Sequence, residues 1–165
     1  MLTAKTSLET QISSYKIGVD EFLAKPFDEE LLLTRVKNML DTRKRYQRKF
    51  SMNMNIDDLN IVEESNDEKF LKKALEIVKE NYKNTEYEVN DFVNAMNVSK
   101  SLLNKKMQTL IGQSAGNFIR NYRLNIAHEM ILKSKGNIHI SEIAYEVGFN
   151  DPKYFTRCFT KHFGI

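Results

Sequence analysis

The sequence has one cysteine and no long apolar run, and both features restrict what the chain can be. With Cys158 as its only cysteine, the chain cannot form an internal disulfide. A single thiol is typical of a reducing compartment, so we expect a cytoplasmic location. No apolar run reaches the length that crosses a bilayer, and no secretion signal precedes the first helix. We therefore expect no membrane contact from these residues.

Patterns for catalysis and for metal or cofactor binding are also missing. The three histidines are scattered, and His128-Glu129 lacks the second histidine four positions on that zinc proteases require. The glycines form no phosphate-binding loop. Asp20 and Glu21 lack the further carboxylates that a cation site needs. The sequence therefore predicts neither an enzyme, nor a cofactor, nor a metal site.

Positive charge is concentrated at the carboxy-terminal end. Residues 99–165 contain ten Lys and Arg against four Asp and Glu, whereas residues 1–66 contain ten against eleven. Residues 67–98 contain five against seven. Such asymmetry indicates a polyanionic partner for the carboxy-terminal part. A solvated basic face would have the same composition, so charge alone leaves both readings open.

Residues 1–40 have the pattern of a short α/β segment. Helical apolar spacing predicts a helix over residues 6–16, which Gly18 would end. Residues 21–24 are expected to form a strand. Asp28 is a suitable N-cap for a following amphipathic helix that reaches Leu40. We expect a linker over residues 41–67, where the basic run at residues 43–49 either extends that helix or contacts a nucleic-acid backbone.

Residues 68–165 are predicted to be helical throughout, which makes the fold mainly α. Apolar spacing and capping residues divide this part into six helices. The expected first helix starts near Phe70, and the expected N-caps or starts of the others are Asn90, Ser99, Ser114, Ser141 and Asp151. Gly112, Gly136 and Gly148 are expected to end three of them. Phe155, Phe159 and Phe163 give the last helix its apolar stripe.

A short helix, a tight turn and a second helix occur twice, over residues 89–107 and 140–159. A direct alignment places Val98 opposite Gly148, and a slip of one residue in the turn improves the match. In a helix-turn-helix unit the second helix enters the major groove and its first turns meet the base edges. The long helix expected at residues 114–134 would separate the two units by about 34 Å, the spacing of successive major grooves.

The second unit also carries a long and specific motif, IAYEVGF at residues 143–149 followed by YFTRCFTKHFG at residues 154–164. With YRLNIA at residues 122–127, this motif makes the region from about residue 70 to 165 resemble the DNA-binding domain of AraC-type transcription regulators. The resemblance implies base reading by Ser101, Asn104, Lys105, Lys153, Thr156 and Arg157. Ser99, Lys100 and Lys161 suit phosphates. Pro152 departs from a position that is often polar in the family, and Ile165 precedes the family's usual last short helix.

Residues 1–40 are similar to the end of a two-component receiver domain. The similarity lies in LTA at residues 2–4 and GVDEFLAKPF at residues 18–27. It implies that Thr3 is the switch hydroxyl, Phe22 the switch aromatic and Lys25 the phosphate-pairing lysine, with a cis Lys25-Pro26 bond. A bland alternative is that Lys25 is an exposed lysine before a turn. The strand with the phosphoacceptor aspartate is expected to be missing, so the chain resembles a fragment of a larger sensor-regulator.

These observations predict a DNA-binding transcription regulator, an activator in a two-component signalling system. Its partners would be double-stranded DNA and RNA polymerase, and the unpaired strand edges near the amino terminus would allow a homodimer. An alternative from a different class is a helical protein-interaction module that binds no specific DNA sequence. The acidic residues 67–98 and the linker would suit that role.

Overall fold

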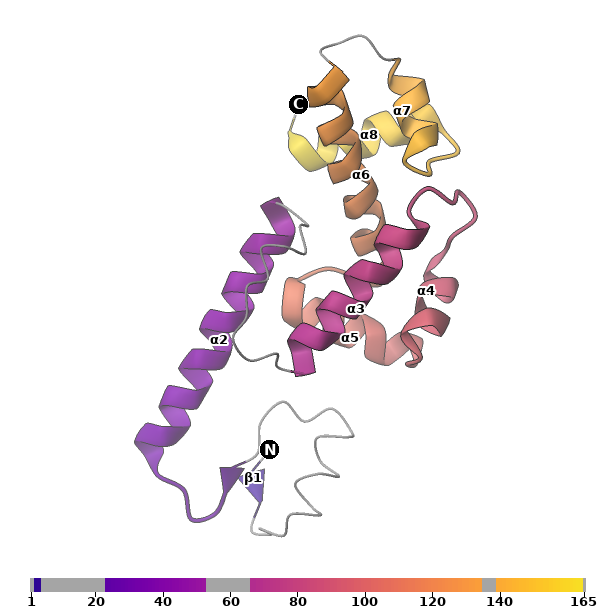
Figure 1. Cartoon of the computed structure of the whole chain (residues 1–165). Helices are drawn as coiled ribbons and strands as arrows, with labels where there is room; N and C mark the ends of the chain where they lie inside the picture. Colours follow the sequence, from indigo (N-terminus) through magenta and orange to yellow (C-terminus); the bar gives the residue numbers. More distant parts are fainter. Residues whose placement is uncertain (1, 4–22, 53–65, 135–138, 165) are drawn as a thin grey trace. The chain divides into compact units, whose positions relative to one another are not determined.

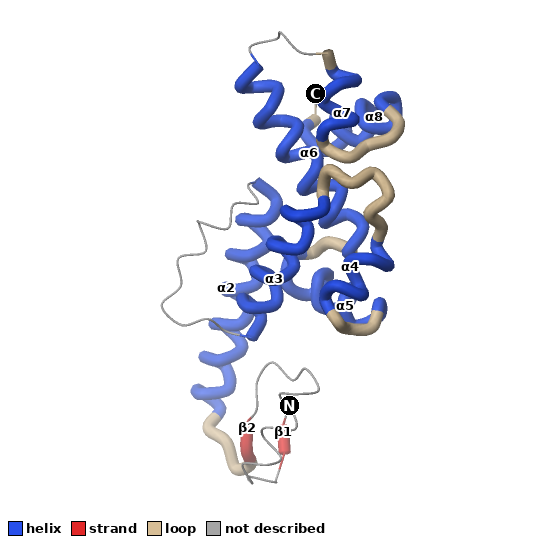
Figure 2. Tube along the Cα trace, turned by 45° about the vertical axis from the view of Figure 1, so that its right-hand side comes forward, coloured by secondary structure: helices blue, strands red, loops and turns tan. Residues whose placement is uncertain are grey.

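The structure is a computed structural model that describes residues 2–3, 23–52, 66–134 and 139–164 (Figure 1). The described part is mainly helical, as predicted, with one pair of two-residue strands (Figure 2). The chain divides into two compact units, residues 1–44 and residues 45–165. Within the described residues, no helix is both long and apolar enough to span a membrane. The helix predicted at residues 6–16 lies outside the described residues.

The first unit contains a small parallel sheet. Strand β1 (Leu2–Thr3) pairs with β2 (Leu23–Ala24), with Leu2 opposite Leu23. The predicted strand at residues 21–24 is thus observed in its last two residues. The Lys25-Pro26 peptide bond is cis, as the resemblance implied. Phe22 lies outside the described residues, and Lys25 is exposed beyond the end of β2.

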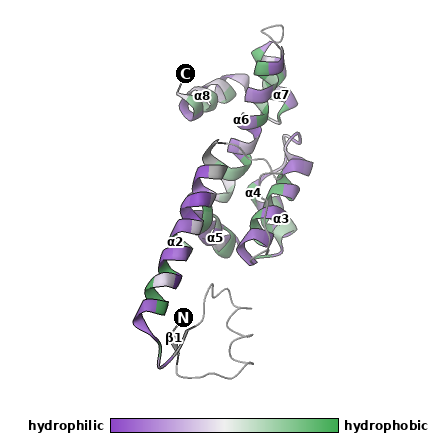
Figure 3. Ribbon diagram, turned by 60° about the vertical axis from the view of Figure 1, so that its left-hand side comes forward, coloured by the Kyte–Doolittle hydropathy of each residue, from purple (hydrophilic) through white to green (hydrophobic). Residues whose placement is uncertain are grey.

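Helix α2 (Glu29–Met52) is longer than the sequence predicted. It begins where expected, because the Asp28 carboxylate accepts a hydrogen bond from the Leu31 N–H at 2.9 Å. Its middle is mainly hydrophilic (Figure 3), yet Tyr46 and Phe50 near its end are buried. The basic run therefore extends the helix, and residues 45–52 of the predicted linker belong to the second unit.

Six more helices lie in the described part of the second unit. They are α3 (Asn66–Asn81), α4 (Val89–Met96), α5 (Lys100–Ile111), α6 (Ala115–Ser134), α7 (Ile140–Glu146) and α8 (Pro152–Phe163). Ser99 caps α5 and Asp151 caps α8, with Pro152 in the first turn, as predicted. The predicted cap of α4 is wrong: Asn90 lies inside the helix, and Glu88 precedes it. The Asp91 carboxylate accepts from the Glu88 N–H at 2.9 Å and so closes this end.

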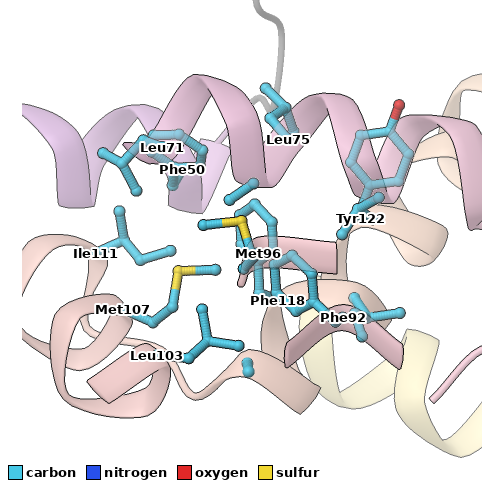
Figure 4. Close-up of a cluster of buried hydrophobic side chains, with 14 of the residues drawn as sticks. Phe50, Leu71, Leu75, Phe92, Met96, Leu103, Met107, Ile111, Phe118 and Tyr122 are labelled. Atoms are coloured by element: carbon cyan, nitrogen blue, oxygen red, sulfur yellow. The ribbon is translucent and has the colours of Figure 1, made fainter. Parts of the chain in front are cut away.

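The first hydrophobic core lies among α3, α4, α5 and the first half of α6 (Figure 4). Phe118 of α6 is at its centre, stacked on Phe92 with ring centroids 6.1 Å apart and tilted against Phe50 at 5.9 Å. The Tyr46 hydroxyl donates to the buried Glu68 carboxylate at 2.6 Å. These contacts attach the end of α2 to the core, and no local sequence pattern indicated them.

A second, smaller core lies among α7, α8 and the second half of α6. Its buried members are Leu124, Ala127, Ile143, Ala144, Val147, Phe149 and Phe155. Phe155 is fully buried as predicted, whereas Phe159 and Phe163 are only partly buried because they lie at the margin of this core. Helix α6 therefore contributes one half to each core, and a single rigid element joins the two.

Candidate nucleic-acid interface

Helices α4 and α5 form one helix-turn-helix unit, and α7 and α8 form the other. Each turn contains one residue with a left-handed backbone, Asn97 with φ 57° in the first and Gly148 with φ 86° in the second. Asn97 thus corresponds to Gly148, which is the one-residue slip that the sequence alignment favoured. In both units the first turn of the second helix carries exposed side chains, as contact with a base edge requires.

The first turns of α5 present polar side chains to solvent. Ser101 and Lys105 are exposed, as a base-reading role requires. The Lys100 ammonium donates to the Asn90 side-chain oxygen at 3.3 Å. The Ser99 hydroxyl accepts from the Leu102 N–H at 3.2 Å and keeps its own proton for an outside acceptor. Four of the five polar residues predicted on this helix and at its cap therefore lie on an accessible face.

Asn104 is the exception on α5, because both polar atoms of its side chain are used inside the domain. Its oxygen accepts from the Ala115 N–H at 3.0 Å, and its amide nitrogen donates to the Lys100 carbonyl at 3.1 Å. The first of these bonds satisfies a free N–H in the first turn of α6. The structure thus gives Asn104 a capping position rather than a place among the accessible side chains of α5.

We expect Asn104→Ala to lower the free energy of unfolding by about 1–2 kcal/mol, because the substitution leaves the α6 N–H without its partner. Urea denaturation of the whole chain would measure this. Asn104→Asp keeps the acceptor beside a helix amino terminus and should retain most of the stability. Gln108→Ala, on the exposed surface of the same helix, is the matched control. If Asn104→Ala kept its stability but lost the ability to discriminate between DNA sequences, Asn104 would be a base-reading residue after all.

Helix α8 presents its predicted reading residues without such obstruction. Lys153, Thr156 and Arg157 are exposed on one face. The Thr156 hydroxyl donates to the Pro152 carbonyl at 2.9 Å, so its oxygen is free to accept. The Arg157 guanidinium lies over the Tyr154 ring at 5.8 Å from the centroid, a cation–π contact that orients it. A pre-oriented guanidinium suits bidentate contact with a guanine edge.

Two hollows lie beside α6 and α8, and sequence reasoning missed most of their residues. The first, of about 460 Å³, is bounded by the start of α4, the first half of α6 and the turn before α8. The second, of about 500 Å³, lies between α6 and α8. Arg120 and Tyr154 line both. Asn117 accepts from the Arg120 guanidinium at 2.9 Å and lines the first. Polar residues three positions apart on α6 are the sequence signal that could have identified these residues. The sequence predicts this helix only as a spacer.

The second hollow is strongly cationic. Arg120, Arg157 and Lys161 line it, and the described residues around it include no carboxylate. His162 also lines it, and burial together with the neighbouring Arg120 lowers the pKa of its imidazole. The histidine is therefore neutral near pH 7, and the three fixed cations supply the positive charge of this hollow. A surface of this kind favours a polyanion, as the charge distribution of the sequence indicated.

Comparisons with known proteins agree with this geometry. Residues 92–165 match a family model described as a helix-turn-helix domain. The chain is 37% identical over 163 residues to a protein of Formosa agariphila named histidine kinase P4, covering 99% of this chain and 12% of that protein. It is 31% identical over 88 residues to the transcriptional activator RhrA of Rhizobium meliloti, covering 53% of this chain and 28% of that protein.

Two further similarities each cover part of the chain. The lactose operon transcription activator of Staphylococcus xylosus is 28% identical over 95 residues, which is 58% of this chain and 33% of that protein. The solved carboxy-terminal domain of the two-component response regulator yesN from Fusobacterium nucleatum is 23% identical, with a TM-score of 0.49, over 56% of this chain and 87% of that one. The chain spans at most a third of the curated relatives named here. Residues 92–165, which match the helix-turn-helix family model, include helices α5 to α8 and most of α4.

Proposed function

We propose that this chain binds DNA in a sequence-specific manner and regulates transcription. The observation that carries the proposal is the sharing of α6 between two helix-turn-helix cores. Its 20 residues form a rod of about 30 Å. Successive major grooves on one face of B-DNA lie about 34 Å apart. One rigid helix of this length can therefore hold α5 and α8 in neighbouring grooves.

The exposed side chains divide into two roles. Base reading falls to Ser101 and Lys105 on α5 and to Lys153, Thr156 and Arg157 on α8. Phosphate binding falls to Ser99, Lys100, Arg120 and Lys161. Arg120 lies on α6, which joins the two units, and lines both hollows, so it is placed to meet the backbone that separates the two grooves. The division gives each group a different expected dependence on salt and on sequence.

The selection of bound sequences from a random DNA pool tests this proposal. We expect the whole chain to enrich one motif with two half-sites, and its affinity to fall steeply as salt is raised, because lysines and arginines release counterions. Enrichment of no motif at any salt concentration would contradict sequence-specific binding. That result would favour the alternative, a helical module that binds another protein.

Substitution of Arg157 should affect specific and random DNA unequally. We expect Arg157→Ala to weaken binding to the selected site by about 1–3 kcal/mol and to relax the preference at one base pair. Lys161→Ala, four residues along the same helix, is the matched control and should weaken both DNAs about equally while reducing the salt slope by about 1. Fluorescence anisotropy titrations on both DNAs measure the effects. An equal loss for Arg157→Ala on both would contradict its base-reading role.

We further propose that the protein is an activator in a two-component system, with RNA polymerase as its second partner. The names of two relatives as transcription activators, and the match of nearly the whole chain to a protein named histidine kinase, support this. The parallel pairing of β1 and β2 across a 19-residue connection (residues 4–22) supports a receiver-type α/β segment. Thr3, Phe22 and Lys25 as switch residues, and a homodimer through this segment, belong to the same proposal. Light scattering that shows only monomer at high concentration would contradict the homodimer.

A further inference from the structure

The loop between α3 and α4 connects the two helix-turn-helix units away from the axis of α6. Arg123 of α6 reaches this loop, and its guanidinium donates to the Tyr82 carbonyl at 2.8 Å and to the Asn84 carbonyl at 2.7 Å. Tyr82 packs edge-on against Tyr122 at 5.5 Å, and its ring contacts both hydrophobic cores. The loop is thus held by two hydrogen bonds from the Arg123 guanidinium and by the aromatic contact between Tyr82 and Tyr122.

The same loop also contacts the turn of the second unit. The Tyr82 carbonyl lies so close to Gly148 that a Cβ at this glycine would stand 2.1 Å from the oxygen. Next in the loop, the Lys83 ammonium forms an ion pair with Glu146 at the end of α7. We call this group of contacts, made by Tyr82, Lys83 and Asn84 with Arg123, Glu146 and Gly148, the interunit clasp.

Arg123 is the member on which the interunit clasp depends most. Its guanidinium is half-buried, and burial lowers its pKa from the usual value, although an arginine of this kind remains charged. Two diverging N–H groups are needed to reach two carbonyls, and the planar fork of arginine supplies them. A lysine at this position would keep the charge but would bind as a single point donor.

We infer that Arg123 is a positioning residue that sets which spacing between two DNA half-sites the protein accepts. The inference rests on the proposed DNA-binding function. Helix α6 is packed into both cores, so a change in the angle between the units requires α6 to bend between its two halves. A second connection away from the axis of α6 resists that bending, so the angle between α5 and α8 is fixed. Each added base pair turns a half-site by about 35° around the duplex, so a fixed angle selects one spacing.

The test compares binding to a ladder of DNAs in which one or two base pairs are added to or removed from the region between the selected half-sites. For the whole wild-type chain we expect one strong optimum. For Arg123→Ala and Arg123→Lys we expect weaker binding at that optimum and a preference over the other spacings that is reduced about fivefold or more. A uniform loss at every spacing would overturn the inference, and so would rescue of the spacing profile by lysine, because charge alone would then suffice.

A measurement without DNA separates this inference from the proposed function. Spin labels at Gln108→Cys on α5 and Thr160→Cys on α8, in a Cys158→Ser background, report the distance between the units by double electron–electron resonance. We expect a narrow distribution with Arg123 and a broader one with Arg123→Lys at unchanged helix content. An equally narrow distribution in the variant would overturn the interunit clasp even if DNA binding is confirmed. Failure to select any DNA motif would instead contradict the proposed function.

Discussion

Phe155→Ala is expected to lower the stability of the second helix-turn-helix unit by about 3–5 kcal/mol. The Phe155 side chain is 1% exposed and lies at the centre of the smaller core. Its ring is edge-on to Phe149 at 5.1 Å and tilted against Phe159 at 5.5 Å. The core around α7 and α8 has seven buried members, so it has few other contacts to compensate for a cavity of this size.

The loss of stability in Phe155→Ala should be confined to the second helix-turn-helix unit, and it should weaken DNA binding. Amide hydrogen exchange is expected to accelerate in α7 and α8 while α3, α4 and α5 stay protected, because their core is separate. With one reading unit left, affinity for the two-half-site DNA should fall by about 10²–10⁴-fold, the usual gain from linking two sites. Leu132→Ala, at a side chain that is 66% exposed, is the control. Equal acceleration of exchange in both units would contradict separate cores.

Gly148→Ala should be the second most disruptive change. We expect it to lower the free energy of unfolding by about 2–4 kcal/mol, from two causes that add. The backbone at Gly148 has φ 86°, a conformation that residues with a Cβ adopt at a cost of about 1–2 kcal/mol. The new Cβ would also stand 2.1 Å from the Tyr82 carbonyl, which is backbone and cannot rotate away. The loop between α3 and α4 must then move, and the hydrogen bonds from Arg123 move with it.

Gly112→Ala is the matched control for this change. Gly112 also has a left-handed backbone, with φ 70°, but a Cβ there would meet the Gln47 side chain at an ordinary 3.8 Å. We expect Gly112→Ala to show the backbone cost alone, so the difference between the two variants isolates the contact with Tyr82. Thermal unfolding by circular dichroism measures both. If the two variants lose equal stability, the contact between Gly148 and the loop contributes nothing.

The sequence predicted those elements whose signals are local. Asp151 and Pro152 indicated the start of α8, Ser99 indicated the start of α5, and both are confirmed. Each of these signals acts within one helical turn, so no knowledge of the tertiary fold is needed to read it. Apolar spacing likewise identified the helices of the second unit and most of their buried residues.

The features that the sequence did not predict depend on contacts between distant segments. Tyr46 lies within a hydrophilic stretch, and its place in the core depends on contacts with distant residues such as Glu68, 22 residues on. Helical spacing predicted that Asn104 is exposed and could read a base. In the structure, its side-chain oxygen instead accepts a hydrogen bond from the Ala115 N–H in the next helix. The sequence did not predict a role for Arg120. The spacing of apolar residues in α6 identifies the buried side of that helix, but not what lies opposite its polar side.

The unlike reading faces on the two ends of α6 have a consequence for the symmetry of the DNA site. The face on α5 offers a serine and a lysine, and that on α8 offers a lysine, a threonine and an arginine. Since one continuous helix joins them in a fixed order, a single copy of the domain has no twofold axis. If the chain binds DNA as proposed, we expect its site to be non-palindromic and to have a direction. Inverting that site beside a promoter would then present the opposite end of the protein to whatever is bound there.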